Sequence, residues 1–216
     1  MTCRIPIPPL DPLIDEWPAG KPIYRLYRVD YASEQFNPGL DDQGNQVKST
    51  RFAPIRNEQG KIVPYIYGGS SLDCAIFETV FHDVPIDGLY KYVDLEYFSN
   101  YCHAILAPQR VLRLVDLTTD GLHRLKVPKE ELITSPSRYY KETALWAQTL
   151  HWQGPDADGL MWMSRPRDRD QSLMLFGDRV KASDLKVSTK GGALQNNTPL
   201  QQVIIELALR VGIDVE

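Results

Sequence analysis

Apolar and polar residues alternate in several short segments of the chain, and this alternation predicts β-strands. Strands of this kind are expected at residues 23–29, 89–98 and 111–117, and further strands at 62–67 and in the short apolar runs 159–163 and 173–176. The strands do not alternate regularly with helices, as they would in a doubly wound parallel fold. The pattern therefore favours an α+β fold with a curved or split β-sheet core and flanking helices.

Apolar residues return at helical spacing in three other segments. These segments span residues 70–82, 137–150 and 199–211. Ser70 or Ser71 is placed to cap the first helix. At about 100° per residue, Glu78 and His82 fall with Ser71 on a side away from the apolar stripe. The first helix therefore presents a carboxylate and an imidazole away from its buried face.

The two ends of the chain have a different composition from the centre. Residues 1–22 are rich in proline, which predicts an extended arm. The polar residues 188–198 predict a linker, followed by an amphipathic helix that Pro199 begins and Gly212 ends. The apolar face of this helix either supports a homodimer or packs back on the domain, and packing back is favoured. The expected division is an arm (1–22), a central domain (23–187), and a linker with a C-terminal helix (188–216).

Charge and cysteine content exclude several classes of protein. The 216 residues include 24 basic and 28 acidic ones, a net charge of −4, which provides no basic footprint for nucleic acid. Three cysteines without a CxxC pair favour a reducing compartment, and the four histidines show no metal-ligand spacing, so no metal is expected. No signal peptide and no apolar run of the roughly 18 residues that a membrane helix needs are found. We therefore expect a cytoplasmic protein without a membrane span.

Five polar residues stand in apolar surroundings, where charged groups seldom lie unless they are paired. They are Arg28, Arg51, Tyr67, Glu78 and Ser164. One interpretation is structural, an ion pair of Glu78 with an arginine and a capping serine. The familiar local fingerprints GxGxxG, the P-loop, HExxH and GxSxG are absent.

The order of these residues resembles the RES-domain family, which is named for its Arg, Glu and Ser. The resemblance rests on Leu-Tyr-Arg-Val at 26–29, on Arg-Phe at 51–52, and on Tyr67 eleven residues before Glu78. Glu-Thr-Val-Phe-His at 78–82 and a serine, Ser164, after an apolar strand complete it. It covers residues 23 to about 180. Either Arg25 or Arg28 can match the family arginine, and the flanking residues favour Arg28.

The resemblance implies an ADP-ribosyltransferase-like fold that binds NAD⁺ as a substrate and breaks its nicotinamide–ribose bond. It implies catalytic roles for Arg28, Glu78 and Ser164, and NAD⁺ binding by Arg28, Arg51, Tyr67 and Ser164. Inorganic phosphate is a candidate co-substrate, and no other cofactor is implied. It further implies a toxin that is neutralised by a partner, an antitoxin of the Xre type.

The residue types suit this chemistry. The planar fork of arginine fits the two phosphates of NAD⁺. Breaking the N-glycosidic bond builds positive charge on the ribose, which the carboxylate of Glu78 can stabilise. Tyr67 can stack on a flat ring or bind the ribose, and Ser164 can donate to a phosphate or orient Glu78. The sequence leaves the acceptor open as phosphate, water or a protein side chain.

Three other functions were weighed. A protein mono-ADP-ribosyltransferase would use the same residues. A nucleotide- or partner-binding module without turnover would keep the arginines and have no use for Glu78. Direct nucleic-acid binding is disfavoured by the net charge.

Overall fold

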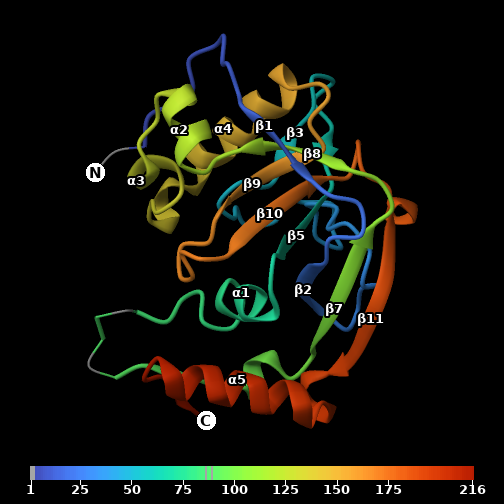
Figure 1. Cartoon of the computed structure of the whole chain (residues 1–216), viewed down its shortest axis with the longest axis vertical. Helices are drawn as coiled ribbons and strands as arrows, with labels where there is room; N and C mark the ends of the chain where they lie inside the picture. Colours follow the sequence, from blue (N-terminus) through green and yellow to red (C-terminus); the bar gives the residue numbers. More distant parts are fainter. Residues whose placement is uncertain (1–2, 86, 89) are drawn as a thin grey trace.

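A curled sheet of eight strands forms the centre of the molecule (Figure 1). The computed structural model describes residues 3–85, 87–88 and 90–216. The strand order is β1-β8-β9-β10-β5-β2-β7-β11, and only β8 and β9 pair in parallel. The strands are Ile14–Trp17 (β1), Ile23–Arg28 (β2), Tyr65–Gly69 (β5), Tyr101–Pro108 (β7), Leu112–Asp116 (β8), Gly159–Met163 (β9), Gln171–Phe176 (β10) and Leu185–Ala193 (β11).

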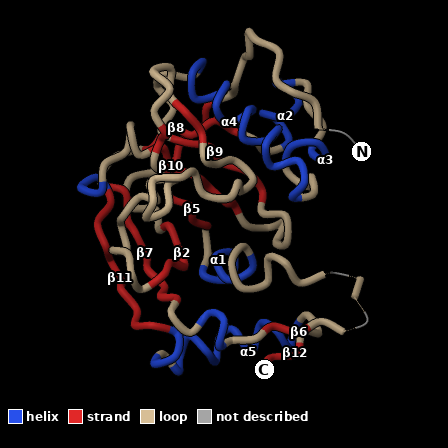
Figure 2. Tube along the Cα trace, turned by 180° about the vertical axis from the view of Figure 1, so that it is seen from behind, coloured by secondary structure: helices blue, strands red, loops and turns tan. Residues whose placement is uncertain are grey.

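Two small ribbons lie outside this sheet. Ile55–Arg56 (β3) pairs with Ile62–Val63 (β4), and Tyr92–Val93 (β6) pairs in parallel with Asp214–Val215 (β12). Figure 2 shows the second ribbon beside the C-terminal helix.

Helices occupy three places around the sheet (Figure 1). The helices α2, α3 and α4 lie together at one end, α1 lies near the middle, and α5 lies at the opposite end. Their bounds are Leu72–Phe77 (α1), Thr119–Leu125 (α2), Lys129–Leu132 (α3), Tyr140–Gln153 (α4) and Thr198–Arg210 (α5). Single 3₁₀ turns span Glu96–Phe98, Ser137–Tyr139, Ala182–Asp184 and Leu194–Asn196.

Both faces of the sheet are buried. Successive side chains along a strand point to opposite faces, so each strand can contribute apolar side chains to both. One face contributes residues of all eight strands to a single core cluster, among them Ile23, Ile66, Leu106, Leu114 and Leu175. The two halves of the sheet therefore curl around a shared apolar interior.

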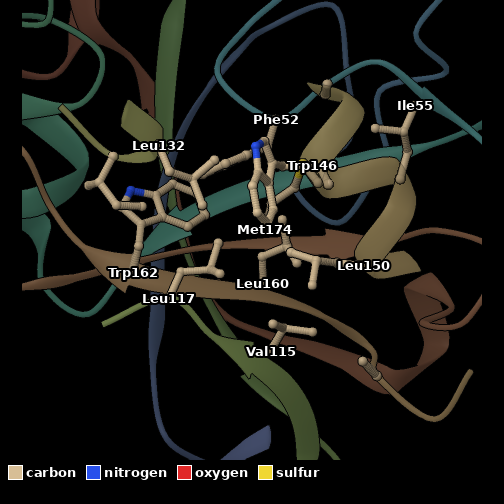
Figure 3. Close-up of a cluster of buried hydrophobic side chains, with 14 of the residues drawn as sticks. Phe52, Ile55, Val115, Leu117, Leu132, Trp146, Leu150, Leu160, Trp162 and Met174 are labelled. Atoms are coloured by element: carbon tan, nitrogen blue, oxygen red, sulfur yellow. The ribbon is translucent and has the colours of Figure 1, made fainter. Parts of the chain in front are cut away.

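The opposite face packs against the helices. Phe52, Trp146, Leu160, Trp162 and Met174 belong to the cluster beneath α2, α3 and α4, and Figure 3 shows their side chains in contact range around the strands. Phe52 and Trp162 meet edge to face with ring centroids 4.9 Å apart. This second cluster forms the base on which the polar residues of the candidate site lie.

A third cluster joins α1 to α5. Ile76 and Phe77 of α1 pack with Leu200, Ile204 and Leu207 of α5. The expectation that the C-terminal helix packs back on the domain is therefore confirmed. A homodimer through this helix stays a prediction.

The α+β class and the curved sheet are confirmed. The predicted strand at 159–163 matches β9, and those at 23–29 and 111–117 match β2 and β8 within a residue at each end. The predicted strand at 62–67 is interrupted at Pro64, which has no amide hydrogen to donate within a ladder.

Four predicted segments differ from the structure. Residues 188–193 continue β11 and pair with β7, so a linker over 188–198 is wrong. The helix expected at 70–82 ends at Phe77, and Glu78 forms its C-terminal cap. Only Tyr92–Val93 of the strand expected at 89–98 is a strand, and residue 89 lies outside the described residues. The arm is also more than a loop, because Ile14–Trp17 pairs with β8 at the sheet edge.

Candidate functional site

The carboxylate of Glu78 lies at the centre of a group of polar side chains. Ser164 donates from Oγ to Glu78 Oε1 at 2.7 Å, and Ser172 donates to the same oxygen at 3.1 Å. His82 Nδ1 lies 3.8 Å from the other oxygen, Oε2. The Glu78 side chain remains 24% exposed, so it is held in place and is still open to a ligand.

Local folding explains why Glu78 faces these serines. Ser71 caps α1 by accepting from the amide of Cys74. Gly69 of β5 lets α1 approach the sheet closely, since a Cβ there would lie 2.7 Å from Cys74 Sγ. The C-terminal end of α1 therefore lies against the ends of β9 and β10, which provide Ser164 and Ser172.

The turn between β9 and β10 is also tied to α1. Arg167 bonds Asp170 at 2.7 Å within the turn and lies 3.1 Å from Asp73 of α1. Its guanidinium also lies over the Phe77 ring, 5.5 Å from the centroid. These contacts fix the turn that begins at Ser164.

The surroundings of Glu78 favour its ionised form. Burial alone would raise the pKa of Glu78, but the interactions with His82, Ser164 and Ser172 outweigh burial and lower it. Glu78 is therefore a carboxylate at neutral pH.

Arg51 is the buried cation of the site. Its residue is only 7% exposed. Nη1 donates to the carbonyl oxygen of Ser135 at 3.1 Å, and Nη2 donates to the Tyr140 hydroxyl at 3.5 Å. Burial lowers the pKa of Arg51, while Tyr140 and the charge of Glu78 raise it. The charges of Arg51 and Glu78 therefore interact, although the two side chains form no direct ion pair.

Tyr67 holds the backbone next to Arg51. Its hydroxyl lies 2.9 Å from Thr50 Oγ1 and accepts from the Phe52 amide at 3.2 Å. Its ring meets Trp162 edge to face. Tyr67 therefore fixes the segment that presents Arg51, and its predicted contact with NAD⁺ stays a prediction.

Tyr140 and His82 join Arg51 to Glu78. The Tyr140 hydroxyl lies 3.3 Å from His82 Nε2, and it is also the oxygen to which Arg51 donates. The guanidinium of Arg51 lies over the Tyr140 ring, 5.2 Å from the centroid. Thr143, one turn further along α4, donates to the Arg51 carbonyl oxygen.

The structure does not bring Arg28 into this group. Its side chain is 57% exposed and pairs with Asp30 at 3.0 Å. Tyr24 of the same strand pairs with Gly69 beside α1, and Arg28 lies four residues, about 13 Å, further along. The two arginines Arg28 and Arg51 therefore have separate partners, and a shared pocket between them is not seen.

Arg25, the other match to the family arginine, is also turned elsewhere. Its Nη1 donates to the carbonyl oxygens of Ser33 and Gln35. Burial lowers the pKa of Arg25 to about 10. Arg25 thus braces the loop after β2, and its side chain makes no contact with Glu78.

Four residues of the site were not predicted as functional, namely His82, Ser172, Tyr140 and Arg165. Ser172 interrupts an apolar strand as Ser164 follows one, so the same criterion would have found it. Tyr140 had no such signal, because its approach to His82 depends on how α4 packs. Arg165 follows Ser164 in sequence, and its positive charge lowers the pKa of Arg51.

A cavity of about 330 Å³ opens elsewhere, between the N-terminal arm and α2. Arg4, Lys126 and Lys129 are its cationic lining residues, and no member of the Glu78 group lines it. Arg4 is already bonded to Glu131 at 2.7 Å. The contacts around Glu78 define the candidate site better than the size of this cavity does.

No group of three or more His, Cys, Asp or Glu side chains within residues 3–85, 87–88 and 90–216 is placed to hold a metal ion. In the same part of the chain, no helix is long and apolar enough to cross a membrane.

Comparison with known proteins agrees with the α+β fold. The RES domain matches residues 22–196, most of the chain, and the protein therefore belongs to the RES domain family. No curated protein matches the chain. A solved structure with a similar fold is the M. tuberculosis MbcT–MbcA toxin–antitoxin complex, with a TM-score of 0.58 and 13% identity over 91% of this chain and 92% of that one.

Proposed function

We propose that the protein cleaves the nicotinamide–ribose bond of NAD⁺. The observation behind this proposal is the Glu78 carboxylate, which two serines hold by one oxygen while its side chain stays partly exposed. A fixed carboxylate lowers the energy of a transition state in which positive charge develops on ribose. Membership of the RES domain family supports the same substrate.

Two cations support an anionic substrate. The charge of Arg165 lowers the pKa of the buried Arg51, and the charge of Glu78 raises it. A bound anion would offset the repulsion between the two guanidinium groups. The diphosphate of NAD⁺ is such an anion, and arginine binds it with two parallel hydrogen bonds.

In the proposed reaction the bond between the nicotinamide nitrogen and ribose C1′ breaks, and its electron pair leaves with neutral nicotinamide. A new bond forms between C1′ and an oxygen of the acceptor. If the acceptor is water, one proton passes to solvent. If it is inorganic phosphate, the product is ADP-ribose phosphorylated at the anomeric carbon.

Incubation of the purified protein with NAD⁺ tests this function. We expect nicotinamide release, and mass spectrometry of the other product separates hydrolysis from phosphorolysis when phosphate is supplied. Transfer to a protein would label the polypeptide instead. Binding of NAD⁺ without any nicotinamide release would show a binding module and contradict the proposal.

We further propose that the protein is the toxin of a toxin–antitoxin pair, neutralised by an Xre-type partner that covers the site. The fold shared with the MbcT–MbcA complex supports this role. An unrestrained enzyme of this kind would remove the NAD⁺ of its own cell. Induction without the partner should stop growth as cellular NAD⁺ falls. Normal growth and steady NAD⁺ from folded protein would contradict the toxin role.

A further inference from the structure

His82 and Tyr140 lie between Arg51 and Glu78, so that four side chains from three segments form one row. The separations along the row are 3.5 Å from Arg51 to Tyr140, 3.3 Å from Tyr140 to His82, and 3.8 Å from His82 to Glu78. Contacts of this length are common in ligand-free sites and shorten when the substrate binds.

The hydrogen-bonding capacity of each group fixes one direction along this row. Arg51 can only donate, and the ionised Glu78 can only accept. The Tyr140 oxygen therefore accepts from Arg51, and its hydroxyl donates to His82 Nε2. A neutral His82 that accepts at Nε2 has its proton at Nδ1, the nitrogen that faces Glu78.

We propose that Tyr140 and His82 are positioning residues that connect the phosphate-binding Arg51 to Glu78 through donors that all point toward the carboxylate. This inference rests on the proposed function, which gives Arg51 its role in binding and Glu78 its role in catalysis. The row of contacts itself is present in the protein without substrate. The two serines donate to Glu78 Oε1, and His82 Nδ1 lies 3.8 Å from Oε2. A bound phosphate at Arg51 would thereby tighten the hold on the ribose-facing carboxylate.

Protonation of His82 breaks the row. An imidazolium has hydrogens on both nitrogens, so Nε2 can no longer accept from Tyr140. The charged and titratable groups that face His82 are Glu78, Tyr140 with Arg51 behind it, and Asp83 at 3.9 Å from Nε2. The row therefore requires a neutral His82 with its proton on Nδ1.

Nitrogen NMR of ¹⁵N-histidine-labelled protein tests the row directly, without NAD⁺. The chain has four histidines, and His82→Gln identifies the His82 signals by their loss. We expect His82 to have its proton on Nδ1 in the wild type and to lose this preference in Tyr140→Phe. Tyr97→Phe is the matched control, because Tyr97 is 76% exposed and far from the row in sequence. Identical His82 signals in the wild type and in Tyr140→Phe would overturn the inference.

Kinetics provide the second readout. His82→Ala removes both ring nitrogens and should lower kcat by about 10-fold with little change in KM. His82→Gln should recover part of this loss, because the amide supplies a donor and an acceptor. Tyr140→Phe should lower kcat by about 10-fold with little change in KM, the loss of one hydrogen bond in the transition state.

The two proposals fail separately. A wild-type protein that leaves NAD⁺ intact but shows the Tyr140-dependent His82 proton would contradict the proposed function and keep the row. An active wild type whose kcat is unchanged in Tyr140→Phe and in His82→Ala, and equally unchanged in the control His123→Gln, would contradict the row alone.

Discussion

The region around Arg51 and the region around Arg28 differ in what surrounds the guanidinium group. Arg51 is 7% exposed and bonds to a carbonyl and two hydroxyl oxygens. Arg28 is 57% exposed and bonds to one exposed carboxylate two residues away. A buried arginine without a direct carboxylate partner keeps its charge available for an anionic ligand, whereas a surface ion pair contributes little to stability or binding.

The residues that contact the two arginines also differ. Tyr67, Thr143 and Tyr140 all bind the segment or side chain of Arg51. Around Arg28, the amide of Val29 bonds the backbone of Asn100, and the arginine side chain takes no part in that contact. We infer that the fold specifies the position of Arg51 and leaves the side chain of Arg28 free to move.

The largest expected effect concerns Glu78, on which the Arg51 region converges. Glu78→Ala should lower the rate of nicotinamide release by about 100-fold or more, because one transition-state contact is lost. Steady-state assays at saturating NAD⁺ measure this loss. Glu58→Ala, at an exposed turn, is the matched control. Near wild-type turnover in Glu78→Ala would refute the role of this carboxylate.

A smaller effect is expected at Arg51 itself. Arg51→Lys keeps the charge but loses the planar fork, so the Kd for NAD⁺ should rise by about 10-fold. Calorimetric titration measures the change, and thermal unfolding shows whether the variant remains folded. An unchanged Kd in folded Arg51→Lys would remove Arg51 from the binding site.

Ser164→Ala should have a still smaller effect on rate, about 3- to 10-fold, because Ser172 still donates to the same oxygen. The pKa of Glu78 lies below its ordinary value because hydrogen bonds outweigh burial, so removal of one bond raises it. The acidic limb of the rate profile should therefore move to higher pH. A shift to lower pH, or none, would show that Ser164 does not stabilise the ionised carboxylate.

The smallest effect is expected for Arg28. Arg28→Ala should change the Kd for NAD⁺ by less than about 2-fold, since it removes only an exposed ion pair. The sequence predicts the opposite, a role for Arg28 in catalysis and binding. If Arg28→Ala and Arg51→Lys lost the same affinity for NAD⁺, Arg28 would lie at the substrate. The contrast drawn between the two arginines would then be wrong.

The sequence predicts much of the sheet because alternating or short apolar runs are local signals. The apolar β9 segment followed by Ser164 illustrates this. So do Glu78 and His82, which fall on one side of their segment. A polar residue in apolar company correctly marked Arg51, Tyr67, Glu78 and Ser164 as a set that the fold brings together.

The rest could not be predicted because it depends on tertiary packing. Residues 188–193 are polar, yet they form β11 because the exposed edge of β7 offers backbone partners. Tyr140 reaches His82 only through the packing of α4. The apolar neighbours of Arg28 in the sequence suggest that its side chain is buried. The alternation of residues in β2 does not show at which residue the strand emerges from the protein interior.

The short strand at the start of the chain has a practical consequence for recombinant work. The family match begins at residue 22, and a fragment cut there would lose β1. The cut would uncover the hydrogen-bonding edge of β8 and empty the space of Trp17, which is fully buried in the whole chain. Uncovered strand edges pair with other chains, so such a fragment would be recovered largely as aggregate, and its lack of activity would reflect poor solubility rather than chemistry.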